Sequence, residues 1–385
     1  MGSKLFVHGS FKNAFSAKHI QLINLKYTSD YTRYLDPDYI TTSGLLNNTY
    51  QQNEWYASVA QKYIPIKWWE VGLSTDFSYN KLDANLYRFA YPRRYSYIGS
   101  FNNNFKWERL TVQASLLYCY FDEHVKYFEG SADRKAISPT IAISYQPFTS
   151  KAFRLRSFYK ESLRMPTFND LYYTLIGNTL LKPEYTKQYN LGFTLTHESK
   201  YLFDNISIQT DAYYNQVRDK IVAVPSANLF RWMMLNLGSV QIKGIEANIG
   251  VTKLIGKEIA WNSGFNYTYQ KAINKTTGQS SYNHQIPYMP LHSGTAHGSI
   301  LWKALSFNYS FMYTGERYAL PENIALNYIQ PFYTTDLGFV YQNNNHRPQW
   351  KAGLDINNLF NQYYDVVHNF PMPGRSYRFS FTVNL

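Results

Sequence analysis

The chain has 385 residues, of which 45% are hydrophobic and 18% aromatic, including 37 tyrosines, 25 phenylalanines and 8 tryptophans. It contains no run of about 18 or more apolar residues, which excludes a transmembrane helix. The formal net charge of +12 is scattered without the basic cluster typical of nucleic-acid binding, so we interpret it as a surface that faces anionic lipid headgroups or an anionic solute.

Apolar and polar residues alternate along most of the chain, without a helical period between the alternating segments. Every second residue is apolar from Leu305 to Tyr313, and again from Tyr377 to Leu385. A period of two places one set of side chains on each face of a β-strand. Together with turn residues, the pattern predicts about 17 strands, near residues 4–14, 19–33, 50–62, 66–80, 92–103, 107–121, 138–147, 152–163, 186–197, 204–222, 230–252, 258–271, 293–303, 305–316, 331–342, 349–358 and 375–385.

Two residues inside these predicted strands stand out. The phase of the alternation changes near Gly244, which predicts a β-bulge at that position.

The single cysteine, Cys119, lies in a strand and has no partner for an internal disulfide. Its surroundings suggest no activated thiol, so we expect no catalytic role for it.

The predicted connections between strands alternate between long and short. Outer-membrane barrels have short periplasmic turns and long outer loops, so we expect Leu385 at the periplasmic rim. The short turns include Ser16–Lys18, Tyr63–Pro65, Pro147–Lys151, Leu254–Lys257 and Lys303–Ala304. The long connections are predicted at 34–49, 81–91, 122–137, 164–185, 223–229, 272–292, 317–330 and 359–374.

An odd number of strands conflicts with this architecture, because single-chain bacterial barrels have an even number and close without an edge. Either the first predicted strand is miscounted and 16 strands close alone, or further strands precede the sequence. We favour the second explanation. Residues 1–20 also lack the apolar stretch of a secretory signal, so we expect a mature terminus or a piece of a longer precursor.

Five blocks of sequence, in the right order over roughly residues 150–385, resemble the motifs of TonB-dependent outer-membrane receptors. The most specific is residues 154–193, which read RLRSFYKESLRMPTFNDLYYTLIGNTLLKPEYTKQYNLGF. Residues 1–150 agree with the family only in their strands and turns. The matching residues are Arg164, Pro166–Tyr172, Gly177, Asn178, Leu181, Pro183, Glu184, Leu191, Gly192, Val240, Lys243–Glu246, Ile286, Pro287, Pro290, His292, Ser293, Tyr313, Gly315–Arg317, Asn357–Phe360, Tyr363, Tyr364 and Pro373–Arg375.

The resemblance implies an all-β fold, a 22-stranded antiparallel transmembrane β-barrel in the bacterial outer membrane whose lumen holds an N-terminal plug. Such receptors import ferric siderophores, haem or cobalamin with energy relayed by TonB. We therefore expect residues 1–385 to be one barrel domain, N-terminally incomplete, with about 16–17 of the strands and no plug. The expected partners are outer-membrane lipid, the barrel-insertion machinery, a solute of the siderophore or cobalamin class, and the TonB complex through the absent plug; we expect no cofactor and no nucleic acid.

Most of the motif residues have a structural interpretation that we prefer to ligand contact. Prolines stiffen loops, a glycine permits a close approach of the backbone, and asparagines cap turns. We assign this structural role to Arg164, Pro166, Asn169, Gly177, Asn178, Pro183, Glu184, Gly244, Glu246, Asn357, Asn358 and Gly374.

Aromatic and basic side chains in the predicted outer loops are the candidates for solute contact, because they can hold an anionic chelate or a flat macrocycle by stacking and charge. The alternative is that such tyrosines only pack one loop on another. Haem is disfavoured, since residues 164–185 contain no histidine, where the resemblance places one in haem receptors. The candidates are Tyr172, Tyr173, Arg231, Trp232, His284, Tyr288, Arg317, Tyr318 and His368.

Three other classes of function remain as alternatives. A self-contained passive porin of about 16 strands would explain the alternation equally well, and a soluble tyrosine-rich protein that binds glycans would explain the composition. An enzyme is disfavoured, because no Ser/His pair has a recognisable local signature and no phosphate loop or dinucleotide fingerprint occurs. No cluster has the spacing of metal ligands.

Overall fold

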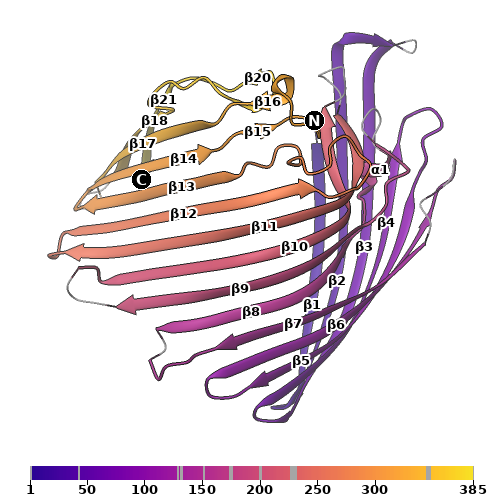
Figure 1. The fold of residues 1–385 in the computed structure, drawn as a ribbon, viewed down its shortest axis with the longest axis horizontal. Helices are drawn as coiled ribbons and strands as arrows, with labels where there is room; N and C mark the ends of the chain where they lie inside the picture. Colours follow the sequence, from indigo (N-terminus) through magenta and orange to yellow (C-terminus); the bar gives the residue numbers. More distant parts are fainter. Residues whose placement is uncertain are drawn as a thin grey trace. The chain divides into compact units, whose positions relative to one another are not determined.

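The computed structural model describes residues 2–41, 44–127, 130, 133–150, 152–172, 177–198, 202–225, 232–343 and 348–384 (Figure 1). This part of the chain consists almost wholly of β-strands, and 17 of them form one antiparallel sheet. Among the described residues, none of the helices has the length and apolarity needed to cross a membrane. All of the strands predicted from the alternation are present. They are β1 (Gly2–Ser16), β2 (His19–Thr41), β3 (Gly44–Ile66), β4 (Trp69–Ala84), β5 (Arg93–Lys106), β6 (Leu110–His124), β7 (Arg134–Tyr145), β8 (Phe153–Arg164), β9 (Glu184–Glu198), β10 (Asn205–Pro225), β11 (Trp232–Ile255), β12 (Ile259–Asn274), β13 (His292–Trp302), β14 (Leu305–Thr314), β17 (Phe332–Asn343), β18 (Gln349–Asn357) and β21 (Ser376–Asn384).

Shorter elements lie in the connections between these strands. One helical turn follows β8, and two small hairpins lie in the last two long loops. These elements are α1 (Phe168–Tyr172), β15 (Arg317–Tyr318), the 3₁₀ turn η1 (Ala325–Asn327), β16 (Tyr328–Ile329), β19 (Asp365–Val367) and β20 (Phe370–Pro371).

The chain divides into two compact units, and strands β7 to β11 contribute to both. The first unit comprises residues 1–143, 158–187 and 219–236, and the second comprises residues 144–157, 188–218 and 237–385.

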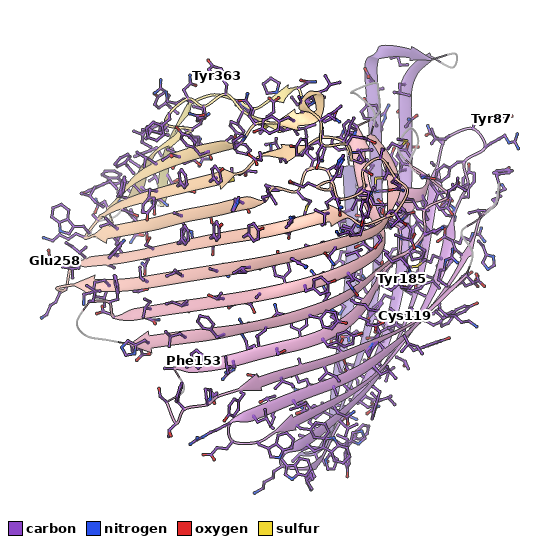
Figure 2. The ribbon with its side chains drawn as sticks, in the orientation of Figure 1. Tyr87, Cys119, Phe153, Tyr185, Glu258 and Tyr363 are labelled. Atoms are coloured by element: carbon purple, nitrogen blue, oxygen red, sulfur yellow. The ribbon has the colours of Figure 1, made fainter. Side chains whose placement is uncertain are left out.

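In the second unit, one face of the sheet is a continuous apolar surface. The register places apolar side chains level with one another from strand to strand, and Figure 2 shows side chains standing on both faces of the strands. Phe339 is 44% exposed and Phe379 is 72% exposed. No second protein layer covers these side chains in the described part, as a soluble sandwich would require. One such row contains Trp261, Ile300, Phe307, Phe339, Leu354 and Phe379.

The first unit repeats this arrangement. Val7 and Trp55 lie on the same face of the sheet, and each is 57% exposed. The opposite face of the same strands carries polar pairs, such as the Lys26–Glu54 ion pair and the hydrogen bond from Asn24 to Ser58. A row on the apolar face contains Val7, Tyr27, Trp55, Tyr79 and Tyr95.

The predicted loop at residues 34–49 is wrong, as is the turn at Tyr63–Pro65. Strands β2 and β3 continue through the first region as a hairpin, with an irregular register between Asp36 and Ile40. Tyr34 and Leu35, which point to opposite faces, are both about half exposed. Alternation fails as a signal there, because neither face of the hairpin is buried at residues 34–36 and 44–49, where the side chains are described. Strand β3 ends at Ile66, so the short turn follows that residue.

The predicted β-bulge at Gly244 is also wrong, since β11 and β12 pair one to one from Val240 to Ile255. The phase changes because Val240 and Ile242 lie on the polar face and are buried there. Their neighbour on β12, Ala272, accepts a backbone hydrogen bond from Ile286 in the loop after β12. That loop therefore lies beside the end of β12, where Gln285 also pairs with Ile273.

Gly244 is required for a close approach rather than for a bulge. A Cβ atom at this position would lie 2.4 Å from the ring of Tyr213, whose hydroxyl hydrogen-bonds the Gln270 side chain at 2.9 Å. We expect Gly244→Ala to lower the free energy of unfolding by about 1–3 kcal/mol, the usual cost of overpacking. The measurement is the unfolding midpoint in detergent.

Gly250 provides the matched control for this prediction. It lies on the same strand and face as Gly244, but nothing lies within 4 Å of a Cβ added there. Gly250→Ala should therefore leave the midpoint unchanged or slightly raised. Equal losses in the two variants would show that the Tyr213 contact is not the cause.

Asp204 fixes the short connection between β9 and β10. Its carboxylate accepts a hydrogen bond from the Leu254 backbone at 2.6 Å and lies 3.1 Å from the Lys253 ammonium. The backbone hydrogen bond, followed by the Lys253 contact, lowers the pKa of Asp204.

A group whose pKa falls on folding stabilises the fold above its unfolded pKa and ceases to do so as the pH falls through the lowered value. We expect Asp204→Asn to reduce the protection of the Leu254 amide from hydrogen exchange at pH 7. The difference from the parent protein should vanish once the pH is below the lowered pKa of Asp204. A difference that persists unchanged in that acidic range would contradict this account.

Candidate functional site

Long and short connections alternate along the described part of the chain as predicted, except that no long loop occurs at residues 34–49. The described long connections are 85–92, 165–172 with 177–183, 275–291, 315–331 and 358–375, and the short ones include 17–18, 67–68, 107–109, 256–258 and 303–304. The candidate loop at 223–229 lies largely outside the described residues. Because strands alternate in direction, the long connections of each unit lie at one end of its strands and the short turns at the other.

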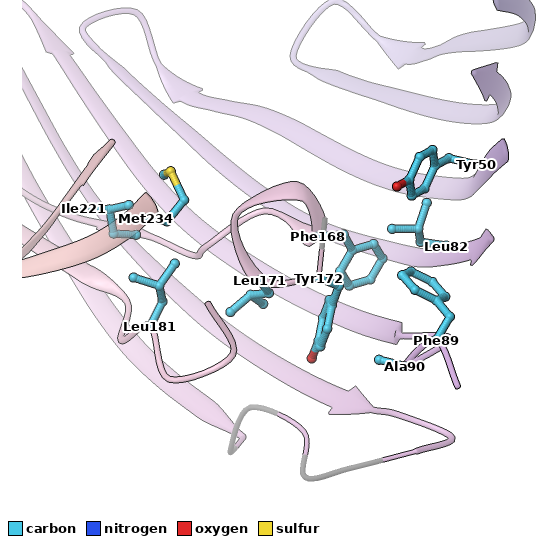
Figure 3. Packing of buried hydrophobic residues seen from close by; sticks show 10 residues of the cluster. All are labelled: Tyr50, Leu82, Phe89, Ala90, Phe168, Leu171, Tyr172, Leu181, Ile221 and Met234. Atoms are coloured by element: carbon cyan, nitrogen blue, oxygen red, sulfur yellow. The ribbon is translucent and has the colours of Figure 1, made fainter. Parts of the chain in front are cut away.

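In the first unit, the loop between β8 and β9 folds inward and forms a small apolar core with neighbouring strand ends (Figure 3). Leu171 of α1 is 1% exposed and Tyr172 is 8% exposed. The Tyr172 hydroxyl donates a hydrogen bond to the Glu123 carboxylate at 2.5 Å. The structure thus buries this candidate for solute contact as a packing residue. The core contains Tyr50, Leu82, Phe89, Ala90, Phe168, Leu171, Tyr172, Leu181, Ile221 and Met234.

The motif residues of this loop hold it together. Thr167 and Asp170 form a reciprocal pair, in which each backbone N–H donates to the other's side chain, at 2.9 and 3.1 Å. A Cβ atom on Gly177 would lie 2.7 Å from the Leu171 carbonyl group, so only glycine fits there. The Asn178 side chain donates to the Met234 carbonyl at 3.0 Å.

Glu184 anchors the end of the same loop. Its buried carboxylate lies 3.2 Å from the Lys220 ammonium and accepts a hydrogen bond from the Ile221 backbone at 3.1 Å. Arg164 lies 3.8 Å from Glu184 and 3.7 Å from Asp170. These contacts join Glu184 to β10 and Arg164 to both ends of the loop.

In the second unit, Arg317 joins two long loops. It is 3% exposed and donates hydrogen bonds to the carbonyl groups of Asp365 at 2.5 Å, Gly315 at 3.3 Å and Val366 at 3.4 Å. Its guanidinium lies 5.2 Å from the centre of the Phe332 ring. Burial lowers the pKa of Arg317, while Tyr288 and Asp365 act in the opposite direction.

Tyr288 and Tyr318 lie beside this arginine. The Tyr288 backbone donates to the Tyr318 carbonyl at 2.8 Å, and the Tyr318 ring meets Tyr328 edge to face at 5.9 Å. Burial raises the pKa of Tyr288, although the nearby His368 backbone and the charge of Arg317 oppose this. The structure therefore brings Tyr288, Arg317, Tyr318 and His368 together.

The other candidates are distributed differently. His284 is half-buried, and its Nδ1 accepts a hydrogen bond from the Asn323 backbone at 3.3 Å. Trp232 is half-buried at the start of β11, in the first unit. Tyr173 and Arg231 lie outside the described residues. Sequence reasoning missed Arg94 and Glu123, which lie at strand ends and carry no local signal of their contacts with the loop after β8.

The polar face of strands β10 to β14 forms a concave wall in the second unit, with a cavity of about 690 Å³. Gly250 and Gly264 pair at its floor, and His297 lies level with them. None of the described residues that line it is an aspartate, glutamate, lysine or arginine. The polar side chains of this face that line the cavity are Asn205, Ser207, Gln209, Asn248, Thr252, Asn262, Asn266, His297, Ser299 and Asn308.

Such a wall can present hydrogen-bond donors and acceptors to water or to a polar solute. Among the described residues, no group of three or more His, Cys, Asp or Glu side chains could hold a metal ion. The arrangement thus supports passage and binding, with aromatic and basic loops at one end of the strands.

Comparison with known proteins identifies one family and several relatives. Residues 6–359 match the family described as TonB dependent receptor-like, beta-barrel. Hemoglobin-binding protein A of Haemophilus influenzae is 31% identical over 139 residues, which are 31% of this chain and 14% of that protein. Vitamin B12 transporter BtuB of Vibrio vulnificus is 36% identical over 83 residues, 22% of this chain and 13% of that protein.

The fold also matches solved structures. The siderophore receptor PiuA from Acinetobacter baumannii superposes with a TM-score of 0.73 at 13% identity, over 99% of this chain and 64% of that one. The chain thus spans less than two thirds of this structure and much smaller shares of the two curated relatives.

The fold is that of an antiparallel transmembrane β-barrel, with an apolar face toward lipid and a polar face toward the lumen. The chain belongs to the TonB-dependent receptor β-barrel family. The predictions of fold class, family and a place in the bacterial outer membrane are confirmed. The relatives are receptors and transporters rather than enzymes, and neither a passive porin nor a soluble glycan-binding protein is favoured.

Proposed function

We propose that this chain is the barrel of an outer-membrane receptor that takes up a scarce solute of the siderophore or cobalamin class, with TonB supplying the energy in the intact protein. The observation that carries the proposal is the match to the receptor family over residues 6–359. Relatives named as a vitamin B12 transporter and a siderophore receptor support this range of solutes. One relative is named for hemoglobin binding, but residues 164–185 contain no histidine, and we keep haem as the less favoured solute.

The aromatic and basic loops of the second unit are the proposed place of solute contact. Tyr318 and His368 are half-buried and have surface available to a ligand. Tyr328 and Tyr363 add further exposed rings, at 37% and 84%. Tyrosine faces and histidine can hold a flat or aromatic solute by stacking. Arg317 and Tyr172 are buried, and we propose that they act by holding the loops.

Uptake by cells that carry the full-length receptor gene tests the proposal. We expect labelled ferric siderophore or cyanocobalamin to bind and accumulate, and accumulation to stop when TonB is deleted while binding at the surface persists. Small sugars and ions should cross no faster than in cells that lack the gene. Accumulation that is independent of TonB and follows the size of the solute would overturn the proposal in favour of a passive porin.

A further inference from the structure

A buried ion pair lies beneath the loop between β8 and β9, in the first unit. The Arg94 Nε atom of β5 lies 2.7 Å from the Glu123 carboxylate of β6, and a second guanidinium nitrogen lies 2.5 Å from it. The Glu123 side chain is 1% exposed and that of Arg94 is 11% exposed. Both nitrogens contact the same carboxylate oxygen, Oε2, and hydrogen bonds between ionised groups are shorter and stronger than neutral ones.

The same two side chains hold the loop at both ends of α1. The Tyr172 hydroxyl donates to the other Glu123 oxygen at 2.5 Å, while Arg94 donates to the Pro166 carbonyl at 2.8 Å. The Arg94 guanidinium also lies 5.0 Å from the centre of the Phe168 ring. The loop and the ion pair therefore complete each other's hydrogen bonding.

A buried ion pair is maintained only when its remaining hydrogen-bonding groups are also satisfied, because desolvation of two charges is costly. With the loop in place, both carboxylate oxygens have donors and the guanidinium has a second acceptor, the Pro166 carbonyl. If the loop lifted, Tyr172 and Pro166 would leave and water would enter around the two charges. The position of the loop and the exclusion of water from the Arg94–Glu123 pair are therefore coupled.

We propose that Arg94 and Glu123 are positioning residues that hold residues 165–172 over the outer ends of β5 and β6. Tyr172 is the third residue of this cluster and not a solute ligand. We call the cluster of Arg94, Glu123 and Tyr172 the latch. The proposal deepens the proposed function, because a loop fixed in this way sets the shape that an arriving solute meets.

Hydrogen exchange of the full chain in detergent tests the latch without any solute. Tyr172→Phe removes one hydroxyl and keeps the ring in the apolar core, so it should not prevent folding. We expect exchange in the peptides that cover residues 165–183 to rise at least about tenfold, since a hydrogen bond to a buried charge is lost. Glu123→Gln should give a larger rise, because it leaves Arg94 without its counter-charge. Exchange within β5 and β6 should stay unchanged in Tyr172→Phe.

Arg156→Gln is the control, since it removes an ion pair with Asp211 at 2.8 Å that does not touch this loop. The double variant Arg94→Gln/Glu123→Gln provides the second readout. The increase in loop exchange in the double variant should be smaller than the product of the increases in Arg94→Gln and Glu123→Gln. The reason is that the double variant leaves no unpaired charge.

Three results would overturn the latch: unchanged loop exchange in Tyr172→Phe and Glu123→Gln, an equal rise in the Arg156 variant, or additive effects in the double variant. Because these measurements need no solute, the latch can fail while TonB-dependent uptake is observed. Uptake can likewise fail while the latch is supported.

Discussion

Replacing Phe265 by arginine is expected to lower the stability of the folded chain in a bilayer by about 2–4 kcal/mol, the cost of a cation on the lipid face near the middle of the membrane. Phe265 lies near the middle of β12, is 45% exposed, and pairs with Ile249 of β11 and Ala296 of β13 on the apolar face. The measurement is the urea midpoint of unfolding for the chain folded into phospholipid vesicles. The fraction of folded protein is monitored by its shifted mobility on gels.

Asn248 supplies the control at the same depth on the opposite face. It lies opposite Asn266, the neighbour of Phe265, and its exposed side chain lines the polar wall. We expect Asn248→Arg to change the midpoint by less than about 1 kcal/mol, because a lumenal cation stays in water. If both substitutions cost the same, the assignment of one face to lipid and the other to the lumen is wrong.

The strands could be predicted because their signal is local. Where one face meets lipid and the other meets water, as at Leu305–Tyr313, the alternation is imposed on every second residue. The hairpin at the ends of β2 and β3 has no such asymmetry, and its sequence therefore resembles a loop. Gly244 was misread for a related reason, since the apolar residues beside it, Val240 and Ile242, are buried on the polar face.

The candidate site was predicted only in outline. The sequence places aromatic and basic residues in the long loops, but it does not show which of them are buried. Arg317 and Tyr172 looked like solute ligands and are buried contacts of the loops. The partners of Tyr172 and of the Pro166 carbonyl lie 49 and 72 residues away in the sequence. Contacts of that range depend on the register of the whole sheet, which no local pattern reveals.

Both units use a buried arginine in the same way. Arg94 donates to a loop carbonyl and lies over Phe168, and Arg317 donates to loop carbonyls and lies over Phe332. A guanidinium suits this task because it has several donors in a rigid plane and a flat face that stacks on an aromatic ring. Each arginine thus fixes a loop without requiring the loop to supply a carboxylate.

Arg317→Lys is therefore expected to loosen the loop after β18 by about 1.5–3 kcal/mol of local opening free energy, the usual value of hydrogen bonds to a charged group. Lysine keeps the positive charge but lacks the planar fork that reaches the carbonyl groups of Gly315, Asp365 and Val366 together. The measurement is hydrogen exchange of the peptides that cover residues 358–375, at neutral pH, in the chain folded in detergent.

Arg375→Lys is the matched control, because Arg375 lies in the same loop, is exposed, and its guanidinium donates to the Leu359 carbonyl at 3.3 Å. That substitution should change the opening free energy by less than about 0.5 kcal/mol. In the intact receptor, the affinity for solute should fall in Arg317→Lys together with the loop protection, since the arginine acts through the loop. A loss of affinity while the exchange of residues 358–375 stays unchanged would instead identify Arg317 as a residue that contacts the solute directly.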